Sequence, residues 1–483
     1  MGWLRFPDGE LGRWACLGTV TDRSVRVWLR DPTCAPHEAR LWVQGTIAAT
    51  ATLTPSPTHD GIAAADVVLP TPAPGAAVTV EVAGHQRIAA LAPAAGDRAA
   101  VRFALGSCHL PFVRRPQGLV VHAGVGIYPA MARVLRARGV QFLLLLGDQV
   151  YSDGLRQVQP RRVLRRRLAA GMPLPPLAAV QAWYRRLYRG FFAQQGFRAL
   201  LEGWPSYLMW DDHDILDGWG SLLHVGPAEQ HLYAAARAAY LEYQHLHNPG
   251  ASLADAPPFD YHFWRGDVGF YVLDVRGARD YRAGVLLGEA QWRRFEAFLE
   301  EATARGVPTV FVGTSIPVFH FPPVLIRLLE HMERPPGSDG RDRWSSTRFR
   351  SERDRLCEQL LAWQAARPDR QVFLLSGDVH AGAAFWVWRP GVRGGLHQWT
   401  SSALTTPSTI GHHLANWLGT AAVNVGEDRY RARCRRRELR NNFAVVEVQP
   451  LERGGHRVTF ALYGYDPDRG LLRAHPPLHA QPR

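Results

Sequence analysis

The sequence predicts an α/β protein in which a layered β-sheet core with flanking helices follows a small all-β sandwich. Up to about residue 98, short segments alternate apolar and polar residues with a period of two, separated by turn-rich pieces. From residue 99 onwards, mostly apolar strands alternate with amphipathic helical stretches, which is typical of sheets covered by helices. The chain has 483 residues, room for two or three domains at roughly 150 residues each. We therefore expect a β-sandwich domain over 1–98 and a larger domain over 99–483.

The N-terminal strands are predicted at 20–30 and 39–43, where every second residue is apolar. Turn residues gather at 54–61 and 70–75. Short strands at this spacing favour a small sandwich. The Ala- and Pro-rich segment 91–99 is expected to be a linker.

The larger domain is predicted as alternating strands and helices. Its buried strands are expected at 101–105, 141–146, 207–210, 269–274, 308–312 and 371–375. Its helices are expected at 128–138, 180–201, 228–245, 288–304 and 351–366, and two further strands at 442–448 and 457–463. The longest irregular stretch, 317–350, is expected to combine a short apolar helix with a Gly-, Asp- and Arg-rich loop, and it is a candidate lid over a site.

Composition excludes several classes of protein. Hydrophobic residues are 46% and charged residues 20% of the chain, as in a globular protein rather than a disordered or fibrous one. All 56 cationic residues are arginine, and with 43 acidic residues they leave a net charge of +13. Arginine grips phosphate with two parallel hydrogen bonds, so the excess is consistent with an anion-binding surface. GC-rich codon usage is the favoured explanation for most of these arginines.

Cysteine usage and hydropathy bear on the location of the protein. Five cysteines without a Cys-x-x-Cys spacing argue against a disulfide scaffold. The first ten residues lack an apolar signal-peptide region, and the longest aliphatic runs, such as 142–146, are much shorter than a membrane span. We therefore expect a cytoplasmic protein without a membrane partner.

Four of the predicted buried strands end in clusters of polar and ionisable residues. The clusters are Gly106-Ser107-Cys108-His109, Gly147-Asp148-Gln149-Val150-Tyr151, Asp211-Asp212-His213-Asp214 followed by Asp217, and Ser376-Gly377-Asp378-Val379-His380. In open α/β sheets, ligands bind in the crevice beyond the carboxyl ends of the strands. We therefore expect the four strand ends to meet at one site.

The expected site is rich in carboxylates. Several carboxylates in one partly desolvated cleft cannot all remain ionised without a cation. Combined with the imidazole of His380, the thiol of Cys108 and the phenol of Tyr151, they form a donor set that suits a transition metal, with oxygen-only positions left for a hard cation. Two ions that share a bridging aspartate would clamp a phosphate and generate a hydroxide nucleophile.

Taken one at a time, these residues also have ordinary structural explanations. A Gly-Asp pair after a strand is common in turns, a cysteine is often a small buried apolar residue, and a histidine can be a satisfied core side chain. The run 211–214 is harder to explain in this way, because four ionisable residues directly after an apolar strand have no role in a core. The conjunction of four such strand ends favours a functional site.

The order of these motifs resembles the PhoD-type alkaline phosphatases, a branch of the calcineurin-like metallophosphoesterases. The resemblance covers nearly the whole chain. It rests on Gly106-Ser107-Cys108, Gly147 to Tyr151, Trp210 to Asp214, Leu273-Asp274-Val275-Arg276, Asp342-Arg343-Trp344 with Arg353 and Arg355 after it, Ser376 to His380, and Asn441-Asn442-Phe443. It implies a layered metallophosphoesterase sheet core over 99–483, preceded by a fibronectin- or immunoglobulin-like β domain over 1–98.

The resemblance also implies a set of metal ligands. Cys108 and Tyr151 would bind a ferric ion, Asp148 would be shared between metals, and Asp378 and His380 would complete the cluster. Family members add calcium, so the implied cofactors are Fe³⁺ and Ca²⁺, with Mn²⁺, Mg²⁺ or Zn²⁺ as alternatives.

Two further ligand positions remain alternatives at this stage. The resemblance makes Asp212 a ligand, but this chain has Asp217-Gly218 where family members often carry an Asn pair. The choice between Asp212 and Asp217 is therefore open, and so is the occupancy of a calcium site. His109 stands where the family commonly has glutamine and would either contact substrate or line the rim.

Two residues are expected to act on the phosphate. The resemblance implies that His213 is the acid or a phosphate contact. Arg276 would hold the phosphate, or else form a salt bridge to Asp274 or Asp280.

We therefore expect a metal-dependent phosphoric ester hydrolase, a phosphodiesterase or phosphomonoesterase, in which a metal-bound hydroxide attacks the phosphate in line. The alternatives are an Arg-rich nucleic-acid-binding protein and a non-catalytic binding module of the same family. Basic runs at 161–167, 185–189 and 435–440 motivate the first alternative, although a solvated or substrate-steering face explains them as well. The expected partner is a phosphoester substrate, and no dedicated nucleic-acid partner is expected.

Overall fold

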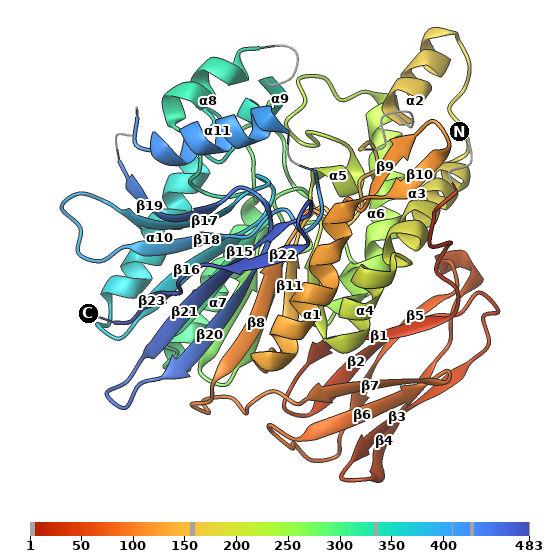
Figure 1. Ribbon diagram of the computed structural model, residues 1–483, viewed down its shortest axis with the longest axis horizontal. Helices are drawn as coiled ribbons and strands as arrows, with labels where there is room; N and C mark the ends of the chain where they lie inside the picture. The colour runs from red at the N-terminus through yellow and green to blue at the C-terminus, as the bar shows by residue number, and fades with distance from the viewer. Residues whose placement is uncertain (1–4, 155–159, 333–336, 408, 426–428, 483) are drawn as a thin grey trace.

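A computed structural model describes residues 5–154, 160–332, 337–407, 409–425 and 429–482. The N-terminal region is all-β and holds two small sheets (Figure 1). One sheet is formed by β1 (Trp14–Val20), β2 (Ser24–Arg30) and β5 (Ile62–Val68), and the other by β4 (Thr46–Leu53), β3 (His37–Val43), β6 (Ala77–Val82) and β7 (His85–Ala90). Side chains of both sheets fill one core, among them Val27 and Leu29 of β2 and Leu41 of β3.

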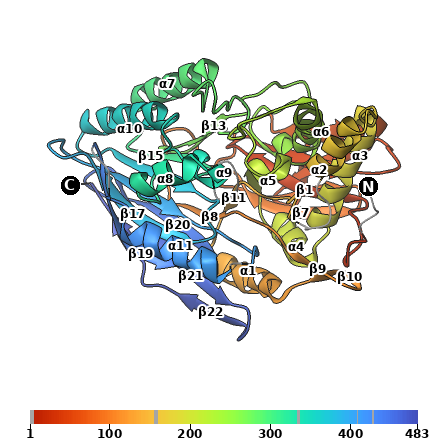
Figure 2. The same cartoon turned by 90° about the horizontal axis from the view of Figure 1, so that it is seen from above.

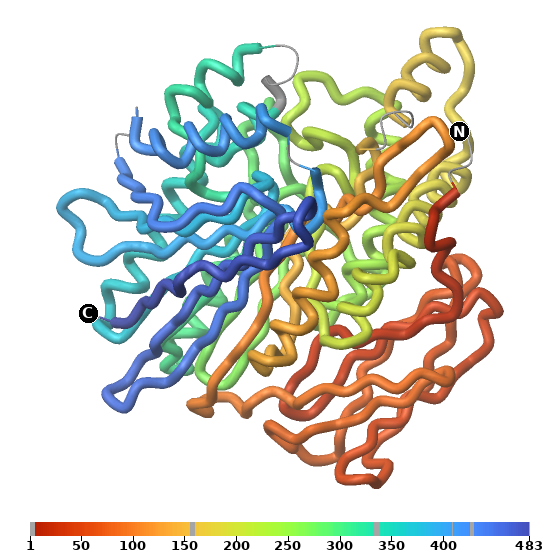
Figure 3. The backbone as a smooth tube through the Cα atoms, in the orientation of Figure 1, coloured from red at the N-terminus to blue at the C-terminus, as the bar shows by residue number. Residues whose placement is uncertain are grey.

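The predicted strand 20–30 is mainly β2, preceded by the last residue of β1 and a turn. The chain reverses at Thr21, whose Oγ1 accepts hydrogen bonds from the backbone N–H groups of Arg23 at 3.1 Å and Ser24 at 2.8 Å. A threonine hydroxyl that bonds to nearby backbone in this way stabilises a turn. Beyond β7, the backbone trace leads through 91–99 into β8 (Figure 3).

Two seven-stranded sheets make up the rest of the molecule. The first has the order β12 (Ser206–Met209), β11 (Phe142–Leu146), β8 (Val101–Gly106), β20 (Asn441–Pro450), β21 (His456–Asp466) and β22 (Leu471–Ala474), with β23 (Leu478–Ala480) also paired to β21. The second has the order β13 (Tyr261–Arg265), β14 (Val268–Val272), β15 (Thr309–Thr314), β16 (Gln371–Ser376), β18 (Leu396–Thr400), β17 (Gly382–Trp388) and β19 (Arg431–Glu438). A separate hairpin joins β9 (Phe112–Arg115) and β10 (Gly118–Val121).

The two large sheets face one another across an aromatic layer. Phe103 of β8 makes edge-to-face contacts with Phe270 of β14 and Phe311 of β15, with ring centroids 5.3 and 5.2 Å apart. Along β15, Phe311 faces this layer, whereas its neighbours Val310 and Val312 belong to the core on the opposite face of the sheet. Successive side chains of a strand point to opposite faces of the sheet, and both faces are buried here. These strands are therefore apolar at every position.

Helices cover the outer faces of both sheets (Figure 2). α7 (Glu289–Ala304) and α10 (Arg350–Ala365) pack on the second sheet, and α1 (Ile127–Ala137) lies on the first. The remaining helices are α2 (Pro160–Ala169), α3 (Leu177–Phe192), α4 (Gln195–Gly203), α5 (Asp212–Ile215), α6 (Pro227–Tyr243), α8 (Pro323–Glu330), α9 (Gly337–Arg341) and α11 (Ile410–Ala421). The mixed α/β class is therefore confirmed. No helix among the described residues is long and apolar enough to span a membrane.

Two expectations about segments need correction. The single helix predicted at 180–201 is α3 and α4, because Gln194 interrupts it and its side chain accepts a hydrogen bond from the N–H of Phe197 at 2.9 Å, capping α4. The segment 317–350 contains the expected short apolar helix, α8, but it also contains a second helix, α9, that was not expected; its residues 333–336 lie outside the described part of the chain. Residues 1–4, on which the signal-peptide expectation partly rests, also lie outside it.

Candidate metal centre

The four predicted strand ends meet, but they come from two sheets rather than one. β8, β11 and β12 run parallel in the first sheet, while β16 belongs to the second. The N–H of Cys108 donates to the carbonyl of Gly147 at 3.1 Å, and the Cys108 Sγ lies 3.7 Å from the carbonyl oxygen of Asp378. The site therefore lies where the carboxyl ends of parallel strands in two facing sheets converge.

Sharp turns carry the expected ligands out of these strands. Cys108, Asp148, Asp378 and His380 all have positive φ angles, of 60°, 58°, 64° and 53°. The left-handed region costs a residue with a Cβ atom roughly 1–2 kcal/mol. Such strain is retained where the surrounding structure enforces it, which is common at functional sites.

Asp148 is at the centre of the first group of side chains. Its Oδ2 accepts hydrogen bonds from the Cys108 thiol at 3.4 Å and from the Tyr151 hydroxyl at 3.2 Å. The Tyr151 hydroxyl also lies 3.3 Å from Nε2 of His380. The structure thus brings together four of the residues that the sequence singles out: thiol, carboxylate, phenol and imidazole in one buried cluster.

Acidic side chains form the adjoining group. Donor atoms of Asp148, Asp212 and His213 lie within 4.8 Å of one another, as do those of Asp211, Asp212 and Asp378. Asp212 belongs to both sets. Asp217 is exposed and, within the part of the chain that the structure describes, belongs to neither.

Burial dominates the electrostatics of the carboxylates in this centre. Burial raises the pKa of Asp148 well above its usual range, with a further increase from Asp211 and Asp212 that His213 opposes only in part. Burial likewise raises the pKa of Asp211 to about 7 although Arg276 opposes the shift. Asp211 Oδ2 is buried and has no hydrogen-bond partner among the described residues. These residues fit a site for metal cations, which would hold the carboxylates in their ionised form.

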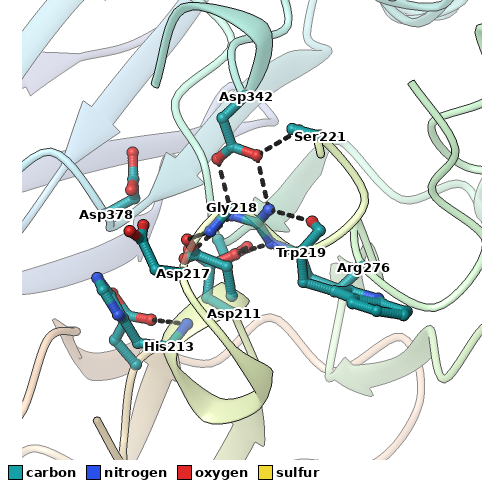
Figure 4. A network of polar contacts seen from close by, with 12 residues as sticks. Asp211, His213, Asp217, Gly218, Trp219, Ser221, Arg276, Asp342 and Asp378 are labelled. Carbon is teal, nitrogen blue, oxygen red and sulfur yellow. Dashed lines mark hydrogen bonds and ion pairs between the residues drawn. The ribbon is translucent and has the colours of Figure 1, made fainter. Parts of the chain in front are cut away.

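Arg276 is fully buried, and its guanidinium lies between Asp342 and Asp211 (Figure 4). Its Nε donates to Asp211 Oδ1 at 2.5 Å, and its Nη1 and Nη2 donate to the two oxygens of Asp342 at 2.7 and 2.9 Å. Its Nη2 also lies 3.2 Å from Asp212 Oδ1. Arg276 was expected to contact phosphate or to form a side-chain salt bridge with Asp274 or Asp280. This geometry matches neither role, because each guanidinium nitrogen already binds Asp211, Asp342 or Trp219. Only the backbone N–H of Arg276 donates to Asp274.

Arg343 is a second cation at the centre, and its side chain forms an ion pair with Asp378. Its guanidinium also lies over the ring of Phe321, 5.4 Å from the centroid. The side chain of Arg343 is 14% exposed, whereas that of Arg276 is 0% exposed, so only Arg343 of these two is accessible to solvent. In the sequence, Arg343 stands out only as part of Asp342-Arg343-Trp344.

His213 is oriented by a residue that sequence reasoning missed. Its Nδ1 lies 2.7 Å from Oδ1 of Asp153, and its ring stacks on Tyr151 with centroids 4.4 Å apart. Burial lowers the pKa of His213, but Asp153, Asp212 and Asp148 outweigh that effect and raise it well above its usual value. The sequence feature that could have identified Asp153 as a site residue is its position two residues after Tyr151, where the motif ends.

His109 neither contacts a substrate position nor lines the rim, contrary to both expectations. It is fully buried, stacks on Phe197 with centroids 4.0 Å apart, and hydrogen-bonds through its ring to Tyr128 and to the carbonyl of Phe191. Burial lowers its pKa to about 3. His109 is therefore a neutral core residue of the first sheet.

A cavity of about 1140 Å³ opens beside His213. Its lining includes His213, Asp153 and Asp217 from the site, and Arg161, Arg162, Arg165 and Arg166 of α2. Arg161 and Arg165 share Glu229, at 2.7 and 2.5 Å. The cavity therefore has a basic wall, which favours anionic ligands.

Two facing sheets with carboxylate, imidazole and thiol groups at their strand ends form a candidate metal centre. The sequence matches the family model described as PhoD-like phosphatase over residues 117–416. The chain belongs to the PhoD-like phosphatase family, and it is therefore a metal-dependent phosphoric ester hydrolase.

Solved structures show the same fold. The structure of PhoD has a TM-score of 0.66 at 16% identity, covering 99% of this chain and 93% of that one. The purple acid phosphatase PPD1 from yellow lupin (Lupinus luteus) seeds has a TM-score of 0.60 at 9% identity, covering 98% and 74%. No curated protein matches the sequence.

Proposed function

We propose that this protein hydrolyses phosphodiesters at the centre formed by Cys108, Asp148, Tyr151, Asp378 and His380. The observation that carries the proposal is the convergence of these donors around the buried carboxylate of Asp148, whose pKa is raised by burial. The cavity of about 1140 Å³ is larger than a phosphate monoester requires, which favours a diester with groups on both sides of the phosphate.

The donor types support two different metal ions. Cys108, Tyr151 and His380 suit Fe³⁺, Asp148 is placed to be shared, and Asp212 with its oxygen donors suits Ca²⁺. Mn²⁺, Mg²⁺ and Zn²⁺ are the alternatives. Bound metal ions supply Lewis-acid charge for the phosphate oxygens and lower the pKa of a water that attacks phosphorus.

In this proposal, the protein side chains orient the substrate and move a proton. His213, held at Nδ1 by Asp153, protonates the leaving oxygen. Arg343 contacts the phosphate, because its side chain reaches the centre and is partly accessible. Arg276 is a positioning residue that fixes Asp211 and Asp342.

The proposal also covers the arrangement of domains. Residues 1–98 form a β-sandwich domain of fibronectin or immunoglobulin type, supported by the single core shared by two small sheets. Residues 99–483 form the catalytic domain. The cytoplasmic location stays a prediction.

The test combines metal analysis of the purified protein with assays on bis-nitrophenyl and mono-nitrophenyl phosphate. We expect bound metal and faster turnover of the diester. Asp148→Ala and His380→Ala should each lose metal and activity together, whereas Asp468→Ala, an exposed aspartate far along the chain, should retain both. Wild-type turnover in either of the first two variants would contradict the assignment of the centre, and faster monoester turnover would contradict the diester preference.

A further inference from the structure

Helices α8 and α11 present large apolar side chains to solvent. Together these side chains form what we call the apolar rim: Val324 and Leu328 on α8, and Ile410, Leu414, Trp417 and Leu418 on α11. Leu328 is 70% exposed and Ile410 89%. α11 contains no charged residue in its 12 positions, and only Asn416, Gly419 and Thr420 are buried. Exposed large apolar side chains gathered on two neighbouring helices are typical of an interaction site.

The two helices form one surface. His320, just before α8, lies with its Nε2 2.7 Å from Oδ1 of Asn416 on α11. Gly419 of α11 packs so closely on Phe321 that a Cβ atom there would come within 2.5 Å of the ring. α8 and α11 lie side by side in both views of the ribbon (Figures 1 and 2).

The apolar rim borders the metal centre. The side-chain amide of Asn416 donates to the carbonyl of Val379 at 2.8 Å, between Asp378 and His380. The ring of His412, in the first turn of α11, lies 5.5 Å from the ring of His380. A ligand that covers the rim is therefore within reach of the proposed catalytic cluster.

An arginine cluster adjoins the C-terminal end of α11. A cavity of about 430 Å³ there is lined by Thr420 and Ala421 and by the arginine cluster of β19: Arg433, Arg435, Arg436 and Arg437. In the part of the chain that the structure describes, none of these four forms an ion pair with a carboxylate. Arg436 Nε has no hydrogen-bond partner, and Arg437 donates to the carbonyl of Trp417 at 3.1 Å on the rim itself.

We propose that the apolar rim and the arginine cluster dock the protein on an anionic phospholipid surface, and that phosphodiester headgroups there are substrates of the metal centre. The second part rests on the proposed function. Apolar side chains with a tryptophan enter the boundary between headgroups and acyl chains, while arginines bind lipid phosphates beside them.

Other occupants fit less well. A second copy of the chain seated on the same rim would bring two uncompensated arginine clusters together, which like-charge repulsion opposes. A nucleic acid would use the arginines but would leave aliphatic residues such as Ile410 and Leu414 in water.

The test is flotation of the full-length protein with phosphatidylcholine vesicles that contain about a third phosphatidylglycerol. We expect binding to these vesicles and less to phosphatidylcholine alone. The double variant Leu328→Glu/Leu414→Glu should weaken binding about tenfold or more, because it places carboxylates against lipid. Ile88→Glu, at a 69% exposed isoleucine of β7, is the matched control and should bind like the wild type. Arg435→Gln/Arg436→Gln should remove the preference for phosphatidylglycerol.

Turnover of the soluble diester separates the two proposals. The double variant Leu328→Glu/Leu414→Glu should retain turnover of the soluble diester, since the apolar rim does not touch the reacting groups. Vesicle binding without any phosphoesterase activity would refute the proposed function and the substrate assignment but support docking. Activity without vesicle binding, a dimer that Leu414→Glu dissociates, or binding of DNA alone by the arginine cluster would each overturn docking.

Discussion

Arg276 lies between Asp211 and Asp342, with its Nε 2.5 Å from Asp211 Oδ1 and its Nη1 2.7 Å from Asp342 Oδ1. The guanidinium therefore connects Asp211, at the end of β12, with Asp342, which directly precedes Arg343. Burial opposes the charge of Asp342, but Arg276 and Arg279 outweigh it and lower the pKa of that carboxyl. The side chain of Arg276 is 0% exposed, so we expect it to hold these two carboxylates in position rather than to contact substrate.

Replacing Arg276 with methionine should destabilise the fold by about 3–5 kcal/mol, because it leaves buried carboxylates without their partner. Urea unfolding at neutral pH measures the change. The control is Arg305→Met, which removes an exposed ion pair with Glu301 at 2.7 Å and should cost no more than about 1 kcal/mol. Equal stability of Arg276→Met and the wild type would contradict this role.

Tyr151→Phe should weaken and shift the visible absorption of the purified protein, because the Cys108 thiolate would remain. A ferric ion bound to tyrosinate and thiolate gives a charge-transfer band, and the variant removes the phenol oxygen that lies 3.2 Å from Asp148. Burial and Asp148 raise the pKa of Tyr151 well above its usual value, so only a cation would stabilise the tyrosinate. Tyr281→Phe, outside the centre, should keep the band. An active, colourless, iron-free wild type would refute the ferric assignment.

Gly377→Ala should reduce metal content sharply while secondary structure persists. A Cβ atom at this position would come within 2.3 Å of Ser107 Oγ and 2.6 Å of the Leu146 carbonyl, so the turn that carries Asp378 must shift. Metal content and circular dichroism check the outcome. Gly203→Ala is the matched control, since a Cβ atom there meets nothing within 4 Å. A fully loaded Gly377→Ala protein would show that this turn does not position the ligand.

His247 should make the protein sensitive to acid. It is fully buried on Trp28, and burial together with Arg26 lowers its pKa to about 3. Below pH of about 6.5 the unfolded chain binds a proton here that the folded protein does not, so stability falls as the pH decreases towards 3. Between pH 7.5 and 5.0 the wild type should lose about 2 kcal/mol more than His247→Phe.

Urea titrations at the two pH values measure that difference. The measured quantity is the change in the free energy of unfolding between the two pH values. A packing cost of the phenylalanine is the same at both pH values and therefore cancels. Equal pH dependence of the two proteins would mean that His247 titrates normally in the folded state.

Much of the fold could be predicted because its strands are buried on both faces. The apolar runs that became β8, β11, β14, β15 and β16 are continuous, and the residues at the ends of β8, β11, β12 and β16 do converge. Local patterns do not reveal which strands share a sheet, so the division of these strands between two sheets was not predicted. The break between α3 and α4 was missed because Gln194 is an uncommon N-cap.

The roles of single polar residues were harder to predict. Arg276 and Arg343 look alike in the sequence, yet one is enclosed by carboxylates and the other is partly accessible. His109 differs from a site histidine only in its burial against Phe197. The expectation of no membrane partner rested on the lack of a spanning segment, which says nothing about a short uncharged helix such as α11.

The centre is assembled from residues far apart in the chain. Cys108 and Asp378 are 270 positions apart, so synthesis at 5–20 residues per second separates their emergence from the ribosome by about 14–54 s. Asp148 and Tyr151 emerge soon after the thiol, but Asp378 and His380 are missing for the whole of that interval. The complete donor set therefore exists only after the segment around Asp378 has been made, and the nascent cysteine is open to oxidation before it is enclosed.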